Sequence, residues 1–245
     1  MRKIVITSQK GGTGKTTTVV NLGVALGKLG KKVVLIDVDP ESNLTYHFGI
    51  NNPKHSIYDL ITDKATISKV IIKKEGVSVI PSTGLLGNVG IEFANREGRE
   101  LLLKKALKGL KGDYIIIDTP PALDLLTVNA LTWANEVFIP LQVEPFALRG
   151  LKRLFATIQG VKKNLNPNLE IGGVILTLYD ARRRLSGEVE AIVRQHFSSL
   201  IFDTRIRENV SLAESPNHGQ SIFTYAKHSR GAEDYMSLAK EMISG

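Results

Sequence analysis

Residues 8–18, SQKGGTGKTTT, constrain the fold of this chain more than any other part of its sequence. They nearly match the phosphate-binding loop G-x-x-x-x-G-K-[ST], in which a glycine-rich turn joins a strand to a helix. Two residues depart from that pattern, because Gln9 stands where the first glycine is expected and an additional lysine, Lys10, follows it. An apolar run precedes the segment and a stretch of helical periodicity, residues 16–29, follows it. This context predicts a phosphate site between a first strand and a first helix.

The residue types of this loop suit a nucleotide with its metal ion. The glycines let backbone N–H groups converge on phosphate oxygens, and the following helix directs its positive end at the same place. Lys15 is expected to reach the β- and γ-phosphates, and the Thr16 hydroxyl to bind Mg²⁺. The nucleotide-binding residues predicted from the loop are Lys10, Gly11, Gly12, Thr13, Gly14, Lys15, Thr16 and Thr17.

Short apolar runs recur along the chain and alternate with helical patterns. The runs are continuous rather than alternating, which is typical of parallel strands that are covered on both faces. We expect strands at residues 3–7, 32–39, 77–82, 114–121, 136–142, 171–179 and 200–206. Strand alternating with helix predicts an α/β fold with one doubly wound, mostly parallel sheet flanked by helices. With the phosphate loop after its first strand, the expected fold is that of a P-loop NTPase. No internal repeat or linker divides the sequence, so residues 1–245 are expected to form a single domain.

Acidic residues follow two of these expected strands. Ligands of doubly wound sheets bind beyond the carboxyl ends of the strands, where the phosphate loop, residues 37–43, 118–121 and 142–146 should meet. Asp118 ends the run YIIID and is expected to hold the water shell of the metal. Asp37 and Asp39 should lie on the same side of their strand. Asp37 is the expected ligand of a metal-bound water, and Asp39 is placed to orient an attacking water.

Composition restricts the class of protein. The 245 residues are long enough for a large core, and the chain has no cysteine, which excludes disulfides, thiolate-ligated clusters and a cysteine nucleophile. Its beginning lacks the apolar region of a secretion signal, and no run is long enough to span a bilayer. We therefore expect a cytoplasmic protein. The formal net charge of +8 favours an anionic partner such as nucleic acid or a membrane surface.

Six separated motifs together resemble the ParA/MinD family of deviant Walker ATPases, and the ParA/Soj branch most of all. They are KGGTGKTT, DVDP, IIIDTPP, LTVNAL (126–131), PLQVEPFALRGL (140–151) and AESPNHGQSI with SRGAEDY (213–235). The resemblance runs nearly end to end. Gln9 is usual in the ParA branch, whereas the MinD branch tends to keep glycine there.

The resemblance implies a function as well as a fold. Members of this family bind ATP and Mg²⁺ and form a nucleotide-sandwich homodimer. The dimer binds double-stranded DNA without sequence preference and hydrolyses ATP slowly until a ParB-like centromere-binding protein stimulates it. The equivalent of Lys10 reaches the phosphates of the partner's ATP, which resembles an arginine finger supplied in trans. The implied roles are Lys10, Lys15 and Asp39 in catalysis, Thr16, Asp37 and Asp118 at the metal, and nucleoid localisation for the protein.

This sequence departs from the family at two places. Glu41 and Ser42 stand where the family commonly has Gln-Gly, and the family pattern IPRNVRL reads Ile206-Arg207-Glu208-Asn209-Val210-Ser211-Leu212 here. That segment usually lies near the adenine, so Asn209 is a further expected nucleotide-binding residue. The candidate DNA-binding residues are Arg182, Arg183, Arg184, Arg205, Arg207 and Arg230, of which Arg230 matches the family best. A solvated loop is an equally good interpretation of residues 182–184, which follow an expected strand.

Three other functions are compatible with parts of this sequence. A MinD-like protein that positions a protein cargo would share the same chemistry, but its membrane-bound form needs a basic amphipathic C-terminal helix, and YMSLAKEMISG lacks a basic face. Stable membrane association is therefore not expected. A metabolic ATPase that acts on a small molecule would need a second constellation of catalytic residues, which we do not find. A DNA-compacting protein without catalysis would leave the ATP site unexplained.

Overall fold

The computed structural model describes residues 1–144, 147–197 and 200–244. Their seven strands form one sheet in the order β3-β4-β2-β5-β1-β6-β7, in which only the β3–β4 pair is antiparallel. The strands are β1 (Arg2–Ile6), β2 (Val33–Asp37), β3 (Ile72–Lys74), β4 (Val77–Ile80), β5 (Tyr114–Asp118), β6 (Glu136–Gln142) and β7 (Glu170–Thr177). The expected mostly parallel α/β fold is confirmed.

Helices lie in most of the connections between these strands and follow the last strand, β7. The α-helices are α1 (Lys15–Lys28), α2 (Asn43–His47), α3 (Ile57–Ile61), α4 (Ile67–Val70), α5 (Val89–Glu92), α6 (Leu102–Ala106), α7 (Leu125–Trp133), α8 (Ala147–Asn164), α9 (Arg184–Phe197), α10 (Val210–Glu214), α11 (Ile222–Tyr225) and α12 (Arg230–Ser244). Short 3₁₀ helices are η1 (Gly84–Asn88), η2 (Arg99–Leu101) and η4 (Ser215–His218). None of the described helices combines the length and apolar character that a membrane crossing requires.

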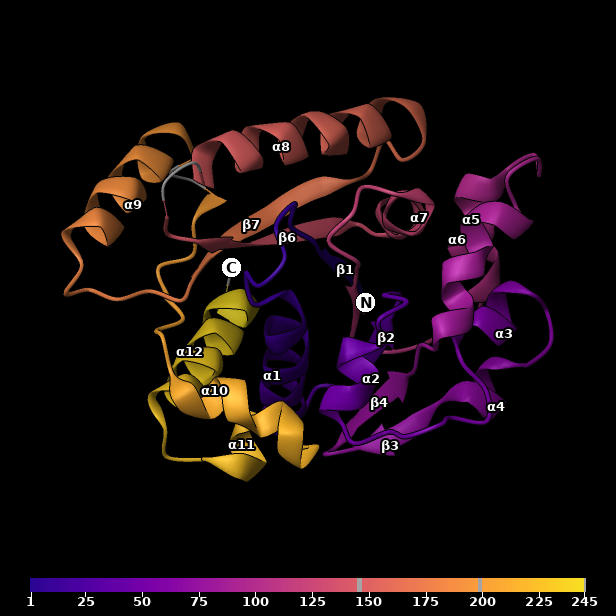
Figure 1. Cartoon of the computed structure of the whole chain (residues 1–245), viewed down its shortest axis with the longest axis horizontal. Coiled ribbons are helices and arrows are strands. Elements are labelled where there is room, and N and C mark those ends of the chain that lie inside the picture. Colours follow the sequence, from indigo (N-terminus) through magenta and orange to yellow (C-terminus); the bar gives the residue numbers. More distant parts are fainter. Residues whose placement is uncertain (145–146, 198–199, 245) are drawn as a thin grey trace.

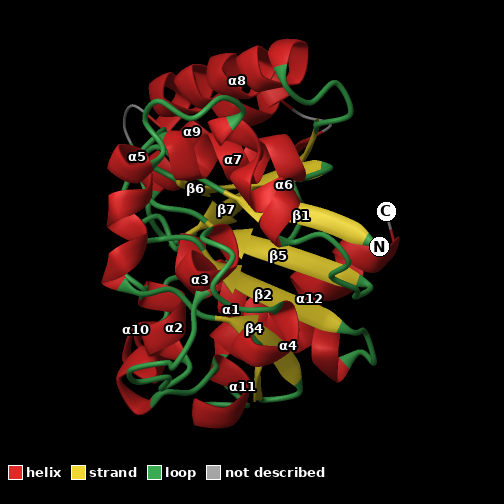
Figure 2. Cartoon of the chain, turned by 90° about the vertical axis from the view of Figure 1, so that its right-hand side faces the viewer, coloured by secondary structure: helices red, strands yellow, loops and turns green. Residues whose placement is uncertain are grey.

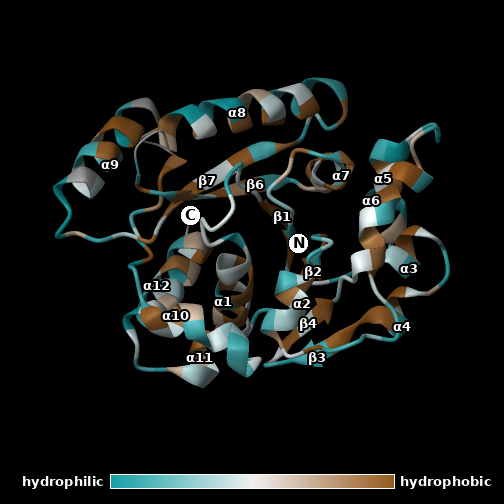
Figure 3. Cartoon of the chain, viewed as in Figure 1, coloured by the Kyte–Doolittle hydropathy of each residue, from teal (hydrophilic) through white to brown (hydrophobic). Residues whose placement is uncertain are grey.

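The sheet is covered on both faces, as its continuous apolar strands predict. Helices α1, α10, α11 and α12 lie on one side of it and α7, α8 and α9 on the other (Figures 1 and 2). Two separate clusters of buried side chains correspond to these two layers. Figure 3 shows apolar and polar residues alternating along α8, whose buried side chains include Leu151, Leu154, Ile158 and Val161 at helical spacing. Every residue of β2 and β5 is buried.

The expected strand at residues 200–206 was wrong. This segment lies beside β7 but pairs with it only at one isolated bridge, Val174 with Ile201; a second bridge, Tyr179 with Arg207, lies just beyond the segment. The backbone N–H groups of Asp203 and Thr204 donate instead to the Glu241 carboxylate on α12. Because a ladder needs successive N–H groups to face the neighbouring strand, this diversion interrupts the pairing. The strands expected from the sequence did not include β3, which is a short edge strand with two lysines.

The strand register places the chemically important residues at one edge of the sheet. In β1, β5 and β2, Ile6 pairs with Asp118 and Asp37 pairs with the same Asp118. The carboxyl ends of these three central strands are therefore level with one another. The phosphate loop (residues 8–16) follows β1 at this edge, and α1 follows the loop.

Candidate nucleotide-binding site

The phosphate loop is preorganised to receive an anion. Gly12 and Gly14 have φ angles of +75° and +83°, which residues with a side chain adopt only with strain. Gly14 is also the N-cap of α1, and no side chain caps that helix. The first backbone N–H groups of α1 are consequently left for a ligand, and the helix dipole favours a negative one.

Buried hydroxyl groups fix the shape of this loop from behind. The hydroxyls of Ser8 and Thr13 are 2.8 Å apart, and Ser8 Oγ also donates to the Lys10 carbonyl at 3.0 Å. Thr177, the last residue of β7, donates its hydroxyl to the Thr13 carbonyl at 2.8 Å. The structure thus gives Thr13 a positioning role within the loop. Sequence reasoning missed Thr177, although its place at the carboxyl end of a strand was a signal for it.

Two adjoining cavities lie along the loop. The phosphate cavity, about 210 Å³, is lined by Gly11, Gly12, Gly14, Lys15, Thr16, Thr17, Asp39, Glu41, Asn43 and Pro121. The base cavity, about 170 Å³, is lined by Gly12, Gly14, Thr17, Thr177, Leu178, Ile206, Arg207, Asn209, Leu212, Ala213 and Tyr235. Gly12, Gly14 and Thr17 belong to both, so together the cavities form an elongated site that fits phosphates at one end and a base at the other. Asn209 lines the base cavity, and its expected contact with the nucleotide stays a prediction.

Lys15 lies within a cluster of carboxylates. Its side chain is buried, and burial lowers the pKa of Lys15, although Asp118, Asp39 and Glu41 act in the opposite direction. Of these three acids, Asp39 and Glu41 line the phosphate cavity together with Lys15. Glu41, one of the two departures from the family pattern, thus faces the site.

A metal ion would find oxygen ligands in Thr16, which lines the phosphate cavity, and in Asp118, which accepts from Thr16. Thr16 Oγ1 donates to Asp118 Oδ2 at 2.6 Å, and the other carboxylate oxygen, Asp118 Oδ1, is buried without a hydrogen-bond partner. Burial raises the pKa of Asp118 well above its usual range; the neighbouring Asp37 raises it further, and Thr16 and Lys15 oppose this. An orphaned, fully buried carboxylate oxygen beside a hydroxyl fits a cation. In the described ranges no group of three or more His, Cys, Asp or Glu side chains could hold a metal ion, so nucleotide and water must complete the shell, as is usual for Mg²⁺.

Asp37 accepts three hydrogen bonds within its own chain. Its Oδ1 accepts from the Asp39 N–H at 3.1 Å, and its Oδ2 accepts from both the backbone N–H and the hydroxyl of Thr45, at 2.9 and 2.7 Å. Burial raises the pKa of Asp37 to about 6, and these hydrogen bonds oppose the shift. The contacts tie α2 to the end of β2. The metal-water role expected for Asp37 stays a prediction.

Asp39 lies in the phosphate cavity, where an attacking water would need it. One oxygen, Oδ1, accepts from the Glu41 N–H at 3.0 Å, which fixes the carboxylate. Burial raises the pKa of Asp39, while the Glu41 hydrogen bond and Lys15 lower it. The structure brings Asp39, Lys15 and Thr16 to one cavity, as the sequence analysis expected.

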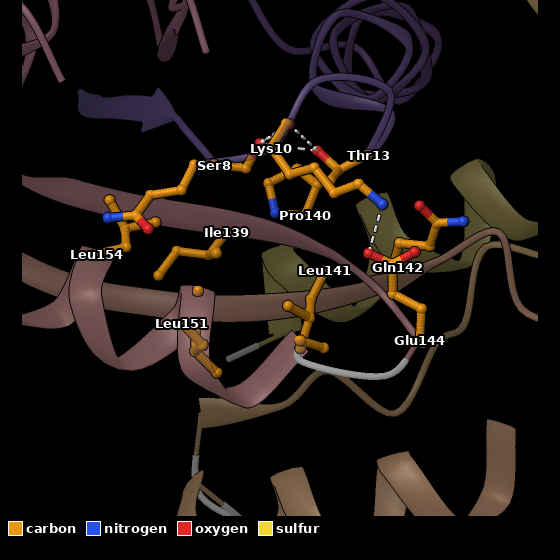
Figure 4. Close-up of a pocket in the computed structure, with 13 residues that line it drawn as sticks. Ser8, Lys10, Thr13, Ile139, Pro140, Leu141, Gln142, Glu144, Leu151 and Leu154 are labelled. Atoms are coloured by element: carbon orange, nitrogen blue, oxygen red, sulfur yellow. Dashed lines mark hydrogen bonds and ion pairs between the residues drawn. The ribbon is translucent and has the colours of Figure 1, made fainter. Parts of the chain in front are cut away.

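Lys10 lies apart from this group. It is not among the described residues that line either the phosphate or the base cavity. It lines a third, larger cavity of about 520 Å³, the α8 cavity, between the phosphate loop, the end of β6 and α8 (Figure 4). There its amine donates to Glu144 Oε1 at 2.5 Å. The segment 142–146, expected at this edge, is described only to Glu144, because residues 145–146 lie outside the described residues.

The arginines expected at DNA gather on one side but are mostly engaged in ion pairs. A cavity of about 720 Å³ is lined by Tyr179, Asp180, Ala181, Arg182, Arg205, Arg207, Glu208 and Arg230. Five of the six candidates pair with carboxylates: Arg182 with Asp180, Arg183 with Asp180 and Glu208, Arg184 with Glu188, Arg205 with Glu190, and Arg207 with Asp234 and Glu233. Their contribution to DNA binding stays a prediction.

Comparison with known proteins agrees with this geometry. Residues 1–171 match a family described as "AAA domain". The chain is 46% identical to the sporulation initiation inhibitor protein Soj of Bacillus subtilis, with 98% of each chain covered. It is 42% identical to the chromosome partitioning protein ParA of Caulobacter vibrioides, over all of this chain and 94% of that one. The chain belongs to the ParA/Soj family of P-loop ATPases.

A solved structure shows the same fold with nucleotide and metal bound. Cobyrinic acid a,c-diamide synthase from Mycobacterium smegmatis, crystallised with ADP and magnesium, is 33% identical, with a TM-score of 0.86 over 98% of this chain and 92% of that one. ATP and Mg²⁺ are thus the ligands that suit this member of the ParA/Soj family, in agreement with the cavities around its phosphate loop.

Proposed function

We propose that this ParA/Soj-family chain is a DNA-partition ATPase that works as an ATP-bound homodimer. The dimer binds DNA without sequence preference, and a ParB-like partner accelerates its slow ATP hydrolysis. The observation that carries this proposal is that the two lysines of the phosphate loop lie at different places. Lys15 lines the phosphate cavity of its own chain, whereas Lys10 lies outside it and is half exposed. A cation in that place is available to a second copy.

The residues of the phosphate cavity supply binding and orientation. Thr16 and Asp118 would hold Mg²⁺, which neutralises charge on the β- and γ-phosphates when bound. Lys15 and the N–H groups at the start of α1 bind the phosphate oxygens. Asp39, held by the Glu41 N–H, orients water towards the γ-phosphate. Phosphoryl transfer needs little beyond such positioning and charge stabilisation.

Lys10 makes pairing conditional on the γ-phosphate. In a dimer its amine compensates the negative charge of the partner's nucleotide rather than of its own, because Lys10 lines the α8 cavity and not the phosphate cavity of its own chain. Hydrolysis removes that charge, and both the partner and the DNA are released. The net charge of +8 supports binding to the phosphates of the DNA backbone, which does not depend on base sequence.

One experiment tests the proposal as a whole. Gel filtration and gel shift on random-sequence duplex DNA are compared without nucleotide, with ADP and with ATP. We expect a dimer and a DNA shift with ATP alone. A protein that stays monomeric and off DNA with ATP would contradict the proposal.

Three variants separate the assigned roles. Lys15→Gln should lose nucleotide binding. Lys10→Gln should bind ATP but stay monomeric and off DNA. Asp39→Ala should form a long-lived dimer on DNA, because the water is no longer oriented; rapid turnover in this variant would contradict the role of Asp39.

A small-molecule reaction is the second candidate, because the solved structure that resembles this chain is named a cobyrinic acid a,c-diamide synthase. The phosphate cavity would serve such a reaction equally well. The two functions differ in what stimulates hydrolysis. A partition ATPase should respond to DNA and a centromere-binding protein, whereas a synthase should respond to its acid substrate.

A further inference from the structure

The ion pair between Lys10 and Glu144 joins two segments that are far apart in the sequence. Lys10 is in the phosphate loop, and Glu144 follows the end of β6. The Lys10 Nζ and Glu144 Oε1 atoms are 2.5 Å apart, and Figure 4 shows the lysine side chain extended across the α8 cavity with its amine at the carboxylate. The lysine side chain is 58% exposed and the glutamate side chain 29%.

The backbone at both ends of this pair is fixed. The Lys10 carbonyl accepts from the hydroxyls of Ser8 and Thr13, which hold this part of the loop. The Glu144 N–H donates to the Gln142 carbonyl, and the Glu144 carbonyl accepts from the Ala147 N–H at the start of α8. The side chains therefore meet from two anchored positions. Within the described part of the chain, Glu144 is the carboxylate that determines where the Lys10 amine lies.

We propose that Glu144 is a positioning residue that holds Lys10 within its own chain until a nucleotide-loaded partner takes the amine. This inference rests on the proposed function, in which Lys10 acts on the partner's ATP. Pairing then requires an exchange: the Lys10 amine leaves a carboxylate of its own chain and meets the γ-phosphate of the other. ADP lacks the γ-phosphate and does not compete with Glu144.

The strength of such a contact suits an exchange. An exposed ion pair favours its closed form by only about 1.5- to 5-fold. The contact with Glu144 therefore favours one position of the Lys10 amine but does not prevent the amine from leaving it. Two such pairs must open for each dimer. Removing both carboxylates should therefore tighten the dimer by about 2- to 25-fold.

The variant Glu144→Gln tests this directly, because it removes the charge and keeps the size of the side chain. Dimerisation of the full chain is measured by sedimentation velocity with Mg²⁺ and the non-hydrolysable analogue AMP-PNP. We expect the dimer dissociation constant to fall by 2- to 25-fold, and no dimer with ADP. An unchanged or weaker dimer would overturn the proposal, a weaker one because Glu144 would then act inside the dimer.

Two controls separate positioning from a general effect of charge. Glu170→Gln removes the same charge from another exposed lysine–glutamate pair, with Lys162, and should leave dimerisation unchanged. In the double variant Lys10→Gln/Glu144→Gln, dimerisation should be as weak as in Lys10→Gln alone; rescue by the second change would show that Glu144 does not act through Lys10. Thermal unfolding and ADP affinity should match the wild type in Glu144→Gln.

The same series distinguishes failure of the proposed function from failure of the role of Glu144. If the wild type does not dimerise with AMP-PNP, or does so regardless of Lys10→Gln, the proposed function fails. If the wild type dimerises through Lys10 but Glu144→Gln gives no tighter dimer, only the role of Glu144 fails.

Discussion

At the scale of single residues, the site contains buried acids that are unfavourable without a ligand. Asp118 is fully buried and keeps one oxygen without a partner, and Asp37 and Asp39 lie close by. Natural sites often retain such groups because function needs them, at a cost in stability. The residue types were predicted from sequence, because an acid after an apolar run is a local signal.

Replacing Asp118 should therefore separate stability from function. Asp118→Asn removes a buried acid whose raised pKa disfavours the folded state at neutral pH, so the nucleotide-free protein should become more stable by about 1 kcal/mol, or roughly 2–4 °C in melting temperature. Mg²⁺-dependent nucleotide binding should be lost. Calorimetric melting with and without Mg·ATP checks both; a less stable nucleotide-free protein would contradict this account.

His47 gives a second prediction, which concerns pH. Its side chain is buried at the end of α2, and burial lowers its pKa to about 4. Because the folded pKa lies below the ordinary 6.5, the unfolded chain binds more protons between pH 4 and 6.5. The contribution of His47 to the free energy of unfolding is therefore fully present above pH 6.5. It is lost as the pH falls from 6.5 to 4, by about 3 kcal/mol in total.

Urea unfolding between pH 7 and pH 4 measures this contribution. The raised pKa of Asp37, about 6, acts in the opposite direction between pH 4 and 6, so the wild type alone does not isolate His47. The difference between the wild type and His47→Gln does. Between pH 7 and pH 4, we expect the free energy of unfolding to fall less in the variant than in the wild type. An equal fall in both proteins would contradict the role of His47.

At the scale of elements, the sequence predicted the strands that are marked by a local apolar run. It did not predict features that depend on contacts between distant segments. Six of the expected strands exist because each is an apolar run. The expected strand at 200–206 failed because Glu241, on α12, takes the N–H groups of Asp203 and Thr204. Thr177 was not predicted as a partner of the phosphate loop, because it lies 164 residues from Thr13, which it contacts. The segment 142–146 was expected near the loop, but the ion pair of Glu144 with Lys10, 134 residues away, was not predicted.

The contact between β7 and the phosphate loop should control nucleotide affinity. Thr177→Val keeps the shape of the side chain and removes the hydrogen bond to the Thr13 carbonyl, which leaves a buried acceptor unpaired at a cost of about 1–3 kcal/mol. We expect ATP to bind at least 5-fold more weakly, as measured by titration calorimetry. Thr157→Val, at an exposed site on α8, should not change the affinity.

At the scale of the whole molecule, neighbouring carboxylates partly cancel the positive charge of the candidate DNA-binding arginines. Arg230, at the start of α12, forms no ion pair within the described residues, unlike the other five candidates. Sequence reasoning predicted which arginines gather but not their pairing with acids, since the acids come from other segments. Free and paired arginines should therefore contribute differently to binding of an anionic partner.

Salt dependence of DNA binding measures this difference. If Arg230 contacts phosphate, Arg230→Gln should lower the slope of log affinity against log salt by about 1 for each protomer, on any duplex sequence. Arg184→Gln, which removes an arginine paired with Glu188, should change the slope less. Equal effects would show that ion pairing within the chain does not decide which arginine binds.

Complementation between two inactive variants tests the central claim most directly. Lys10→Gln protomers should bind ATP but offer no amine, and Lys15→Gln protomers should lack ATP but keep Lys10. If Lys10 acts across the interface, mixing the two should produce DNA-dependent ATP hydrolysis that neither shows alone, because one site of each mixed dimer is complete. A mixture no more active than the sum of its parts would contradict the account.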